Sequence, residues 1–204
     1  MRVRGARIGS VLAALLVCAS GVRAGDGLAI GDMAPMKDAK LKNVDGQEVS
    51  IGETAGEKGT LVIFTCNQCP YAKAWEQRLT EIGNTYSARG VGVIAVNAND
   101  PKVVPGDGFE AMKERASERG MKFPYVVDAT SGVAKAFGAT RTPEAFLFDA
   151  TGKLVYHGTI DDNYEDAAKV KSSFLKNALD AVLAGKEVPV SQTKALGCGI
   201  KFRS

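Results

Sequence analysis

The stretch "TCNQCPYAK", Thr65 to Lys73, places Cys66 and Cys69 three positions apart, directly after an apolar run and directly before a proline. The preceding run, residues 59–65 ("GTLVIFT"), is short and rich in β-branched residues, which predicts a strand buried on both faces. Over residues 70–89 apolar side chains recur at helical spacing. The sequence therefore places both cysteines at the junction between a buried strand and a helix.

Predicted strands and helices alternate along the rest of the chain. A hairpin turns at Asp45-Gly46, and a second buried strand covers residues 91–97. The later elements are a charged helix over 109–120, a strand over 124–128, a short helix over 131–138, a hairpin over 142–158 and an amphipathic helix carrying apolar residues from Val170 to Leu183. This order predicts an α/β fold in which a mixed sheet has helices on both faces.

The length of 204 residues, 45% of them hydrophobic, suits one globular domain after an N-terminal leader is removed. Residues 1–24 have a basic start, continue with the apolar run 8–19 and end in Val22-Arg23-Ala24, which places small or modest residues where a leader peptidase needs them; this is the pattern of a cleaved secretory signal. Lipid attachment at Cys18 is the less favoured alternative because large apolar residues precede it. We therefore expect residues 25–204 to form a single domain, with an irregular tail over 186–204, in a periplasmic or secreted protein without a stable membrane span.

The charge of the chain depends on this leader. Four arginines and no acidic residue lie in residues 1–24, so the formal net charge falls from +3 to −1 when the leader is removed. The remainder has no basic block, and its sequence does not indicate a nucleic-acid partner. Three cysteines remain, Cys66, Cys69 and Cys198, which is an odd number in a compartment that permits disulfides.

The start of a helix favours an anion, because its backbone N–H groups are unpaired and the helix dipole is positive there. We therefore expect Cys66 to be the more acidic thiol and to attack as a thiolate, and Cys69, one turn later, to resolve the mixed disulfide. Pro70 either loosens the first helical turn or only fixes where the helix begins. Asp100 and Asp107 lie in a loop rich in proline and glycine, and we expect them to be solvated.

Two alternatives to a redox pair stay open at this point. A permanent Cys66–Cys69 disulfide would stabilise little, because closing so short a loop removes little chain entropy. A zinc site could take three sulfur ligands from Cys66, Cys69 and Cys198 and one nitrogen from His157. His157 is the chain's single histidine, but it lies inside the strand-like run "KLVYHG", where a histidine is more often an ordinary strand side chain.

These motifs together resemble the thioredoxin superfamily, and within it the secreted thioredoxin-like and peroxiredoxin-like proteins of the AhpC/TSA redoxin type. The resemblance covers about residues 30–185. It is carried by "IGDMAP" at residues 30–35, the hairpin "NVDGQEVSI" at 43–51, the CxxC motif and "RTPEAFLFDATGKLVYHG" at 141–158. It implies a thioredoxin-like fold.

The resemblance also implies roles for residues outside the cysteine pair. Pro143 would be the cis-proline that faces the active-site thiols, and the peptide before it would offer backbone hydrogen bonds to an extended partner. Thr142 and Arg141 would lie near the thiols, where the arginine would favour a thiolate. The ending "GCGIKF" is similar to the end of an uncharacterised peroxiredoxin-like branch, and we expect Cys198 either to exchange with the cysteine pair or to pack the tail onto the domain.

Three departures from the superfamily's patterns matter for function. Thr65 stands where thioredoxins usually have tryptophan, so their substrate range does not transfer. The proline and threonine that precede a peroxidatic cysteine are missing from "LVIFTCNQC". Copper-delivering relatives have a histidine just ahead of the strand that corresponds to "FLFD", whereas this chain has Arg141-Thr142-Pro143 there.

The first interpretation is a thiol-disulfide oxidoreductase of the cell envelope that acts on protein disulfides or dithiols, draws on a thiol-based reductant and needs no cofactor. The second is an antioxidant thiol peroxidase, in which a hydroperoxide oxidises Cys66 to a sulfenic acid and Cys69 or Cys198 then closes a disulfide. The third is a carrier that binds copper or zinc through the same thiols.

Overall fold

A computed structural model of the chain describes residues 27–204, so the expected leader and Cys18 lie outside the described residues. The strands are β1 Leu41–Asn43, β2 Glu48–Val49, β3 Gly59–Phe64, β4 Val91–Asn97, β5 Tyr125–Val127, β6 Arg141–Thr142, β7 Glu144–Asp149, β8 Leu154–Gly158 and β9 Cys198–Gly199. The α-helices are α1 Ile51–Thr54, α2 Pro70–Ser87, α3 Phe109–Arg119, α4 Gly132–Phe137 and α5 Phe174–Leu183, and short 3₁₀ turns cover Pro105–Asp107 and Ala167–Lys169.

The central sheet is mixed and has the strand order β2-β1-β5-β4 in one section and β3-β7-β8 in the other. The two sections meet where β3 lies beside β4, and the N–H of Thr65 donates to the carbonyl of Val96 at 3.0 Å. Strands β4 and β5 are parallel, whereas β3 and β7, β7 and β8, and β1 and β2 pair antiparallel. This sheet confirms the predicted α/β class.

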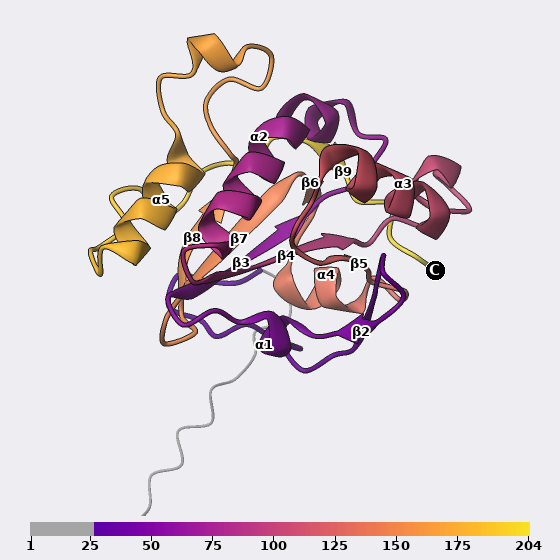
Figure 1. The fold of residues 1–204 in the computed structure, drawn as a ribbon, viewed down its shortest axis with the longest axis horizontal. Coiled ribbons are helices and arrows are strands. Elements are labelled where there is room, and N and C mark those ends of the chain that lie inside the picture. Colours follow the sequence, from indigo (N-terminus) through magenta and orange to yellow (C-terminus); the bar gives the residue numbers. More distant parts are fainter. Residues whose placement is uncertain (1–26) are drawn as a thin grey trace, which may run out of the picture.

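Helices cover both faces of the sheet (Figure 1). In β3, Leu61 and Ile63 point to a core formed with α2, α3 and α5, while Val62 and Phe64 point to a second core formed with α1 and α4. The alternation follows from the pleat of a strand, and it explains why the run over residues 59–64 is apolar throughout. The buried strand therefore ends at the cysteines with both of its faces covered.

Most predicted elements are present, with differences at the two ends. The hairpin of β1 and β2 turns at Gly46, whose φ of 88° lies in the left-handed region that glycine adopts readily. Helix α1 was not predicted, although Ser50 and Glu53 form a capping box at its start. The last helix begins at Phe174 rather than near Val170, and the two-residue strand β9 lies in the tail that we expected to be irregular.

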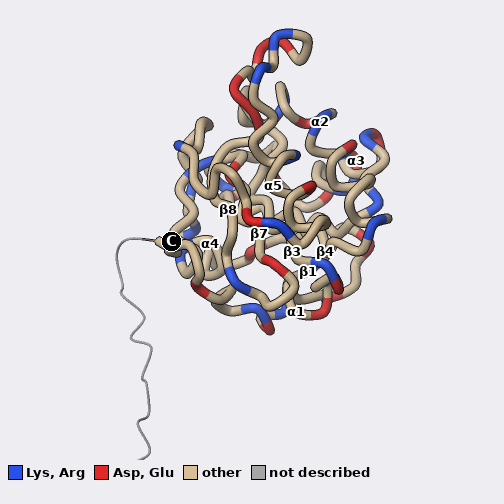
Figure 2. Tube along the Cα trace, turned by 90° about the vertical axis from the view of Figure 1, so that its left-hand side faces the viewer, with Lys and Arg blue, Asp and Glu red and all other residues tan. Residues whose placement is uncertain are grey.

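Charged residues of both signs are interspersed along the chain, and neither sign gathers in one region in the view of Figure 2. This distribution agrees with the lack of a basic block in the sequence. None of the helices within residues 27–204 combines the length and the apolar character needed to cross a membrane.

Candidate functional site

Cys66 and Cys69 lie in the turn between the end of β3 and the start of α2. Cys69 is the N-cap residue of α2 and Pro70 is its first residue, where a proline costs no helical hydrogen bond. Pro70 therefore fixes where the helix begins and does not loosen it. Both cysteines are free thiols, and their residues are only 6% and 4% exposed.

The two thiols face the loop that precedes β7. The peptide bond between Thr142 and Pro143 is cis, as the resemblance implied. Cys69 Sγ donates to the carbonyl oxygen of Thr142 at 2.9 Å, and Cys66 Sγ lies 3.4 Å from the Thr142 hydroxyl. Thr142 thus contacts both sulfurs. The exposed Arg141 directs its guanidinium to the tail instead, where Nη1 donates to the carbonyl of Gly197 at 3.4 Å.

A buried carboxylate holds this loop in place. Glu144 Oε2 accepts the backbone N–H groups of Thr140 at 2.8 Å and Arg141 at 2.9 Å. Both donors precede the cis peptide bond in the sequence and Glu144 follows it, so the carboxylate connects the two sides of that bond. Glu144 Oε1 lies 2.6 Å from His157 Nε2, and the imidazole stacks on Phe146. His157 is therefore a supporting residue of the loop, and its Nε2 faces Glu144. Within residues 27–204, no group of three His, Cys, Asp or Glu side chains is arranged to hold a metal ion.

Asp107 supports the cysteine turn from the loop that follows β4. Its carboxylate accepts the backbone N–H groups of Asn67 at 2.8 Å and Gln68 at 3.0 Å, and the side-chain amide of Asn99 at 2.7 Å. The expectation of a solvated Asp107 was wrong, because the residue is only 1% exposed. One sequence signal could have identified it: β3 and β4 both end at this edge of the sheet, so the polar residues after β4 must meet the cysteine turn.

The surroundings of the two thiols also differ from those that we expected. A hydrogen bond shared with Cys69, burial and the negative charge of Asp107 together raise the pKa of Cys66. The pKa of Cys69 is lowered, because the Cys66 thiol donates a hydrogen bond to its sulfur and Cys198 adds hydrogen bonds from its thiol and its N–H. Asp107 occupies the N–H groups that we expected to stabilise a Cys66 thiolate.

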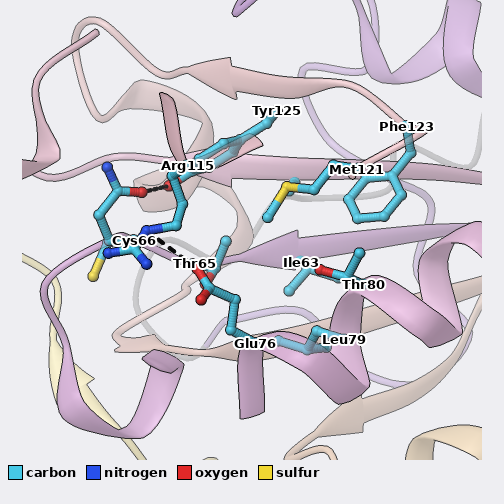
Figure 3. A pocket seen from close by; sticks show the side chains of 12 residues that line it. Ile63, Thr65, Cys66, Glu76, Leu79, Thr80, Arg115, Met121, Phe123 and Tyr125 are labelled. Atoms are coloured by element: carbon cyan, nitrogen blue, oxygen red, sulfur yellow. Dashed lines mark hydrogen bonds and ion pairs between the residues drawn. The ribbon is translucent and has the colours of Figure 1, made fainter. Parts of the chain in front are cut away.

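A small cavity lies beside Cys66 on the side of α2 and α3 (Figure 3). Glu76 lines it, and its carboxylate pairs with Arg119 at 2.6 Å and Arg115 at 3.5 Å. Tyr125 also lines it and donates its hydroxyl to Asn67 Oδ1 at 3.0 Å, and burial raises the pKa of Tyr125 well above its usual value. The volume of about 20 Å³ admits a molecule of the size of water. A protein partner must therefore reach the thiols elsewhere.

The third cysteine lies at the same site. The backbone N–H of Cys198 donates to Cys69 Sγ at 3.4 Å, and Cys198 packs against the group formed by Cys66, Cys69 and Ala72. The structure thus brings together Cys66, Cys69, Thr142, Pro143 and Cys198, adds Asp107 and Glu144 as supporting acids, and leaves the guanidinium of Arg141 at the tail.

Comparisons with known proteins identify the family. The AhpC/TSA family model matches residues 30–157. "Thiol-disulfide oxidoreductase ResA" of Geobacillus thermodenitrificans is 31% identical over 127 residues, which cover 62% of this chain and 67% of that protein. An uncharacterized conserved protein from Geobacillus kaustophilus has a crystal structure with a TM-score of 0.80 at 38% identity, covering 86% of this chain and 93% of that one.

The fold itself is shared more widely. The solution structure of a thioredoxin-like protein in the oxidized form matches with a TM-score of 0.59 at 23% identity, over 78% of this chain and 97% of that one. The chain therefore belongs to the AhpC/TSA family and is a redoxin, an oxidoreductase of the thioredoxin superfamily.

Proposed function

We propose that the protein is a thiol-disulfide oxidoreductase of the cell envelope whose redox couple is Cys66 and Cys69. The observation that carries the proposal is the placement of both thiols against Thr142, directly before the cis bond to Pro143. An extended partner chain that replaces β9 on this peptide edge can pair with it while its own sulfur meets the thiols.

The reduced pair can transfer two electrons to a partner disulfide in two steps. Cys66 loses its proton and forms a bond to one partner sulfur, and the other partner sulfur leaves with the electron pair of the broken bond and takes up a proton. Cys69 then loses its proton and attacks Cys66, which closes the Cys66–Cys69 disulfide and releases the second partner thiol. A thiol-based reductant returns the pair to its starting state.

This assignment accommodates the high pKa of Cys66. A raised pKa lowers the fraction of Cys66 thiolate at a given pH but makes each thiolate that forms a stronger nucleophile. The identity to a protein named as a thiol-disulfide oxidoreductase supports the same chemistry. Export to the envelope rests on the leader pattern over residues 1–24.

A second candidate function is thiol peroxidase activity, and the cavity beside Cys66 favours it. Its volume admits a molecule of the size of water, and hydrogen peroxide is only slightly larger. In this reaction Cys66 attacks a peroxide oxygen, water leaves, and the resulting sulfenic acid condenses with Cys69 to a disulfide and a second water.

One experiment separates the two candidates. The purified protein, carrying Cys18→Ser so that the leader adds no thiol, is assayed for insulin disulfide reduction with dithiothreitol as reductant. Oxidation of the reduced protein by hydrogen peroxide is followed in parallel through Trp75 fluorescence. We expect insulin reduction that is lost in Cys66→Ser and Cys69→Ser, and peroxide oxidation no faster than that of an ordinary thiolate. Insulin reduction at the background rate would contradict the first candidate, and rapid peroxide oxidation would establish the second.

A further inference from the structure

The C-terminal segment from Gly197 to Ile200 lies on the peptide edge that a partner chain would use. Strand β9 pairs antiparallel with β6, so that Cys198 is opposite Thr142 and Gly199 is opposite Arg141. The backbone of Gly197 is pressed against the cis peptide: a Cβ at this position would lie 2.3 Å from the carbonyl oxygen of Thr142. The tail thus occupies the edge as an extended partner would.

Contacts on both sides of Cys198 keep the segment in this register. Before it, the carbonyl of Gly197 accepts the Arg141 guanidinium. After it, Ile200 donates its N–H to the carbonyl of Thr140 at 3.0 Å and is buried in the core on the α1 and α4 face. Lys201 then bonds through its backbone to Asp100 at 2.7 Å and to the side chain of Asn99 at 2.8 Å. The sulfur of Cys198 is therefore held at a fixed place.

That place is in contact with Cys69. The Cys198 N–H donates to Cys69 Sγ, and the Cys198 thiol lies within hydrogen-bond reach of the same sulfur. Cys198 is half-buried, whereas Cys66 and Cys69 are buried. Relative to the cis-proline edge, Cys198 stands where the cysteine of a bound partner would stand.

We propose that Cys198 is a third redox residue, which converts the Cys66–Cys69 disulfide into a Cys69–Cys198 disulfide by thiol-disulfide exchange at Cys69. The Cys198 thiol loses its proton and its sulfur attacks Cys69 Sγ. The Cys69–Cys198 bond forms, the Cys66–Cys69 bond breaks, and Cys66 leaves with the electron pair and takes up a proton. The number of disulfides does not change, so the step needs no further oxidant.

The exchange has two consequences for the reaction. It moves one sulfur of the disulfide to the half-buried tail, where a reductant meets it more readily, and it returns Cys66 to the thiol state. It also means that a protein partner competes with the tail for β6. This inference rests on the proposed function, because it requires a redox-active Cys66–Cys69 pair.

The test uses Cys66→Ser, in which Cys69 and Cys198 are the remaining thiols once Cys18→Ser is present. The protein is oxidised with oxidised glutathione, and the products are identified by mass spectrometry of unreduced peptides. We expect an intramolecular Cys69–Cys198 disulfide as the main product. If the products are glutathione adducts or intermolecular dimers and no intramolecular Cys69–Cys198 disulfide is found, the proposal is overturned.

Two glycine variants in the same background test whether the β9 register produces this product. Gly197→Ala forces the tail from the Thr142 carbonyl, and we expect it to slow closure by about tenfold or more, because closure depends on thiols held in contact. Gly199→Ala is the matched control, since its Cβ would meet no atom within 4 Å, and its closure rate should match that of the parent. Equal rates in the two variants would overturn the proposed role of β9.

Cys198→Ser distinguishes a failure of this inference from a failure of the proposed function. Suppose that Cys198→Ser reduces insulin but Cys66→Ser forms no Cys69–Cys198 disulfide. The proposed oxidoreductase activity is then retained, and the role of Cys198 as a third redox residue is rejected. If oxidised Cys198→Ser contains no Cys66–Cys69 disulfide, the proposed oxidoreductase activity itself is rejected.

Discussion

Asp107 Oδ1 accepts the backbone N–H of Asn67 at 2.8 Å, across 40 residues of sequence. The same oxygen accepts the N–H of Gln68, so a buried carboxylate satisfies both donors of the turn between the two cysteines. The turn is held in place, but the donors are withdrawn from Cys66 and a negative charge is added beside it. The charge of Asp107 thus adds to the hydrogen bond with Cys69 and to the burial that raise the pKa of Cys66.

Replacing Asp107 by asparagine should lower the pKa of Cys66. The substitution removes the negative charge that disfavours the thiolate, so the fraction of Cys66 thiolate at a given pH should increase. Titration of protein labelled with ¹³Cβ-cysteine, followed by NMR, reports each thiol separately. Asp100→Asn is the matched control from the same loop, because Asp100 accepts the N–H of Lys102 rather than a donor of the cysteine turn. An unchanged Cys66 titration in Asp107→Asn would contradict the electrostatic role of Asp107.

The two amides between the cysteines should differ in their contributions to stability. Asn67 is buried, donates to the carbonyl of Gly106 at 3.0 Å and accepts the Tyr125 hydroxyl, whereas Gln68 is exposed. Asn67→Ala should lower the free energy of unfolding by about 2 kcal/mol, since it leaves buried polar partners without hydrogen bonds. Gln68→Ala should stay within about 0.5 kcal/mol of the parent. Urea denaturation of the reduced protein measures both values, and a loss below about 0.5 kcal/mol in Asn67→Ala would show that the Asn67 contacts contribute little.

The fold follows from patterns that are local in the sequence. Strand β3 was predicted from a continuous apolar run, because both of its faces are buried. Helix α2 was predicted from apolar residues at helical spacing, because one of its faces is buried. The capping box of α1 was present in the sequence but belongs to a helix of only four residues, too short to produce a hydrophobic period. Strand β9 has only two residues, so it shows no period either, and its pairing with Arg141 and Thr142 holds it in place.

The site was predictable only where its residues are adjacent in sequence or belong to a known motif. Cys66 and Cys69 were found from their spacing, and Pro143 and Thr142 from the resemblance. Asp107 was missed because a carboxylate's burial depends on which donors the fold brings to it. The surroundings of Cys66 were missed for the same reason: a free helix start stabilises an anion, but here the N–H groups near Cys66 are already taken.

Glu144 should be needed for the loop that carries the cis bond. Its carboxylate accepts the N–H groups of Thr140 and Arg141 and pairs with His157, and the residue is only 2% exposed. Glu144→Ala should therefore lower the free energy of unfolding by about 2–3 kcal/mol, because buried donors lose their acceptor. Insulin reduction should fall as well, since the peptide edge at Thr142 loses its support.

Glu48→Ala provides the control for this prediction. Glu48 is exposed on β2, and its removal should change stability by no more than about 0.5 kcal/mol. If Glu144→Ala is as stable and as active as Glu48→Ala, the loop is held by its other contacts and Glu144 is not a positioning residue.

Removing the Cys198 thiol should raise the pKa of Cys69. The hydrogen bond from Cys66 lowers this pKa most, and the Cys198 thiol and N–H lower it further. Cys198→Ala eliminates the thiol donor but keeps the N–H, so Cys69 should titrate at higher pH and hold less thiolate at a given pH. Cys198→Ser supplies a hydroxyl donor in the same place and should retain most of the lowered pKa. The ¹³Cβ titration of Cys69 distinguishes the variants. Identical curves for Cys198→Ala, Cys198→Ser and the parent would mean that the third thiol does not reach the Cys69 sulfur in solution.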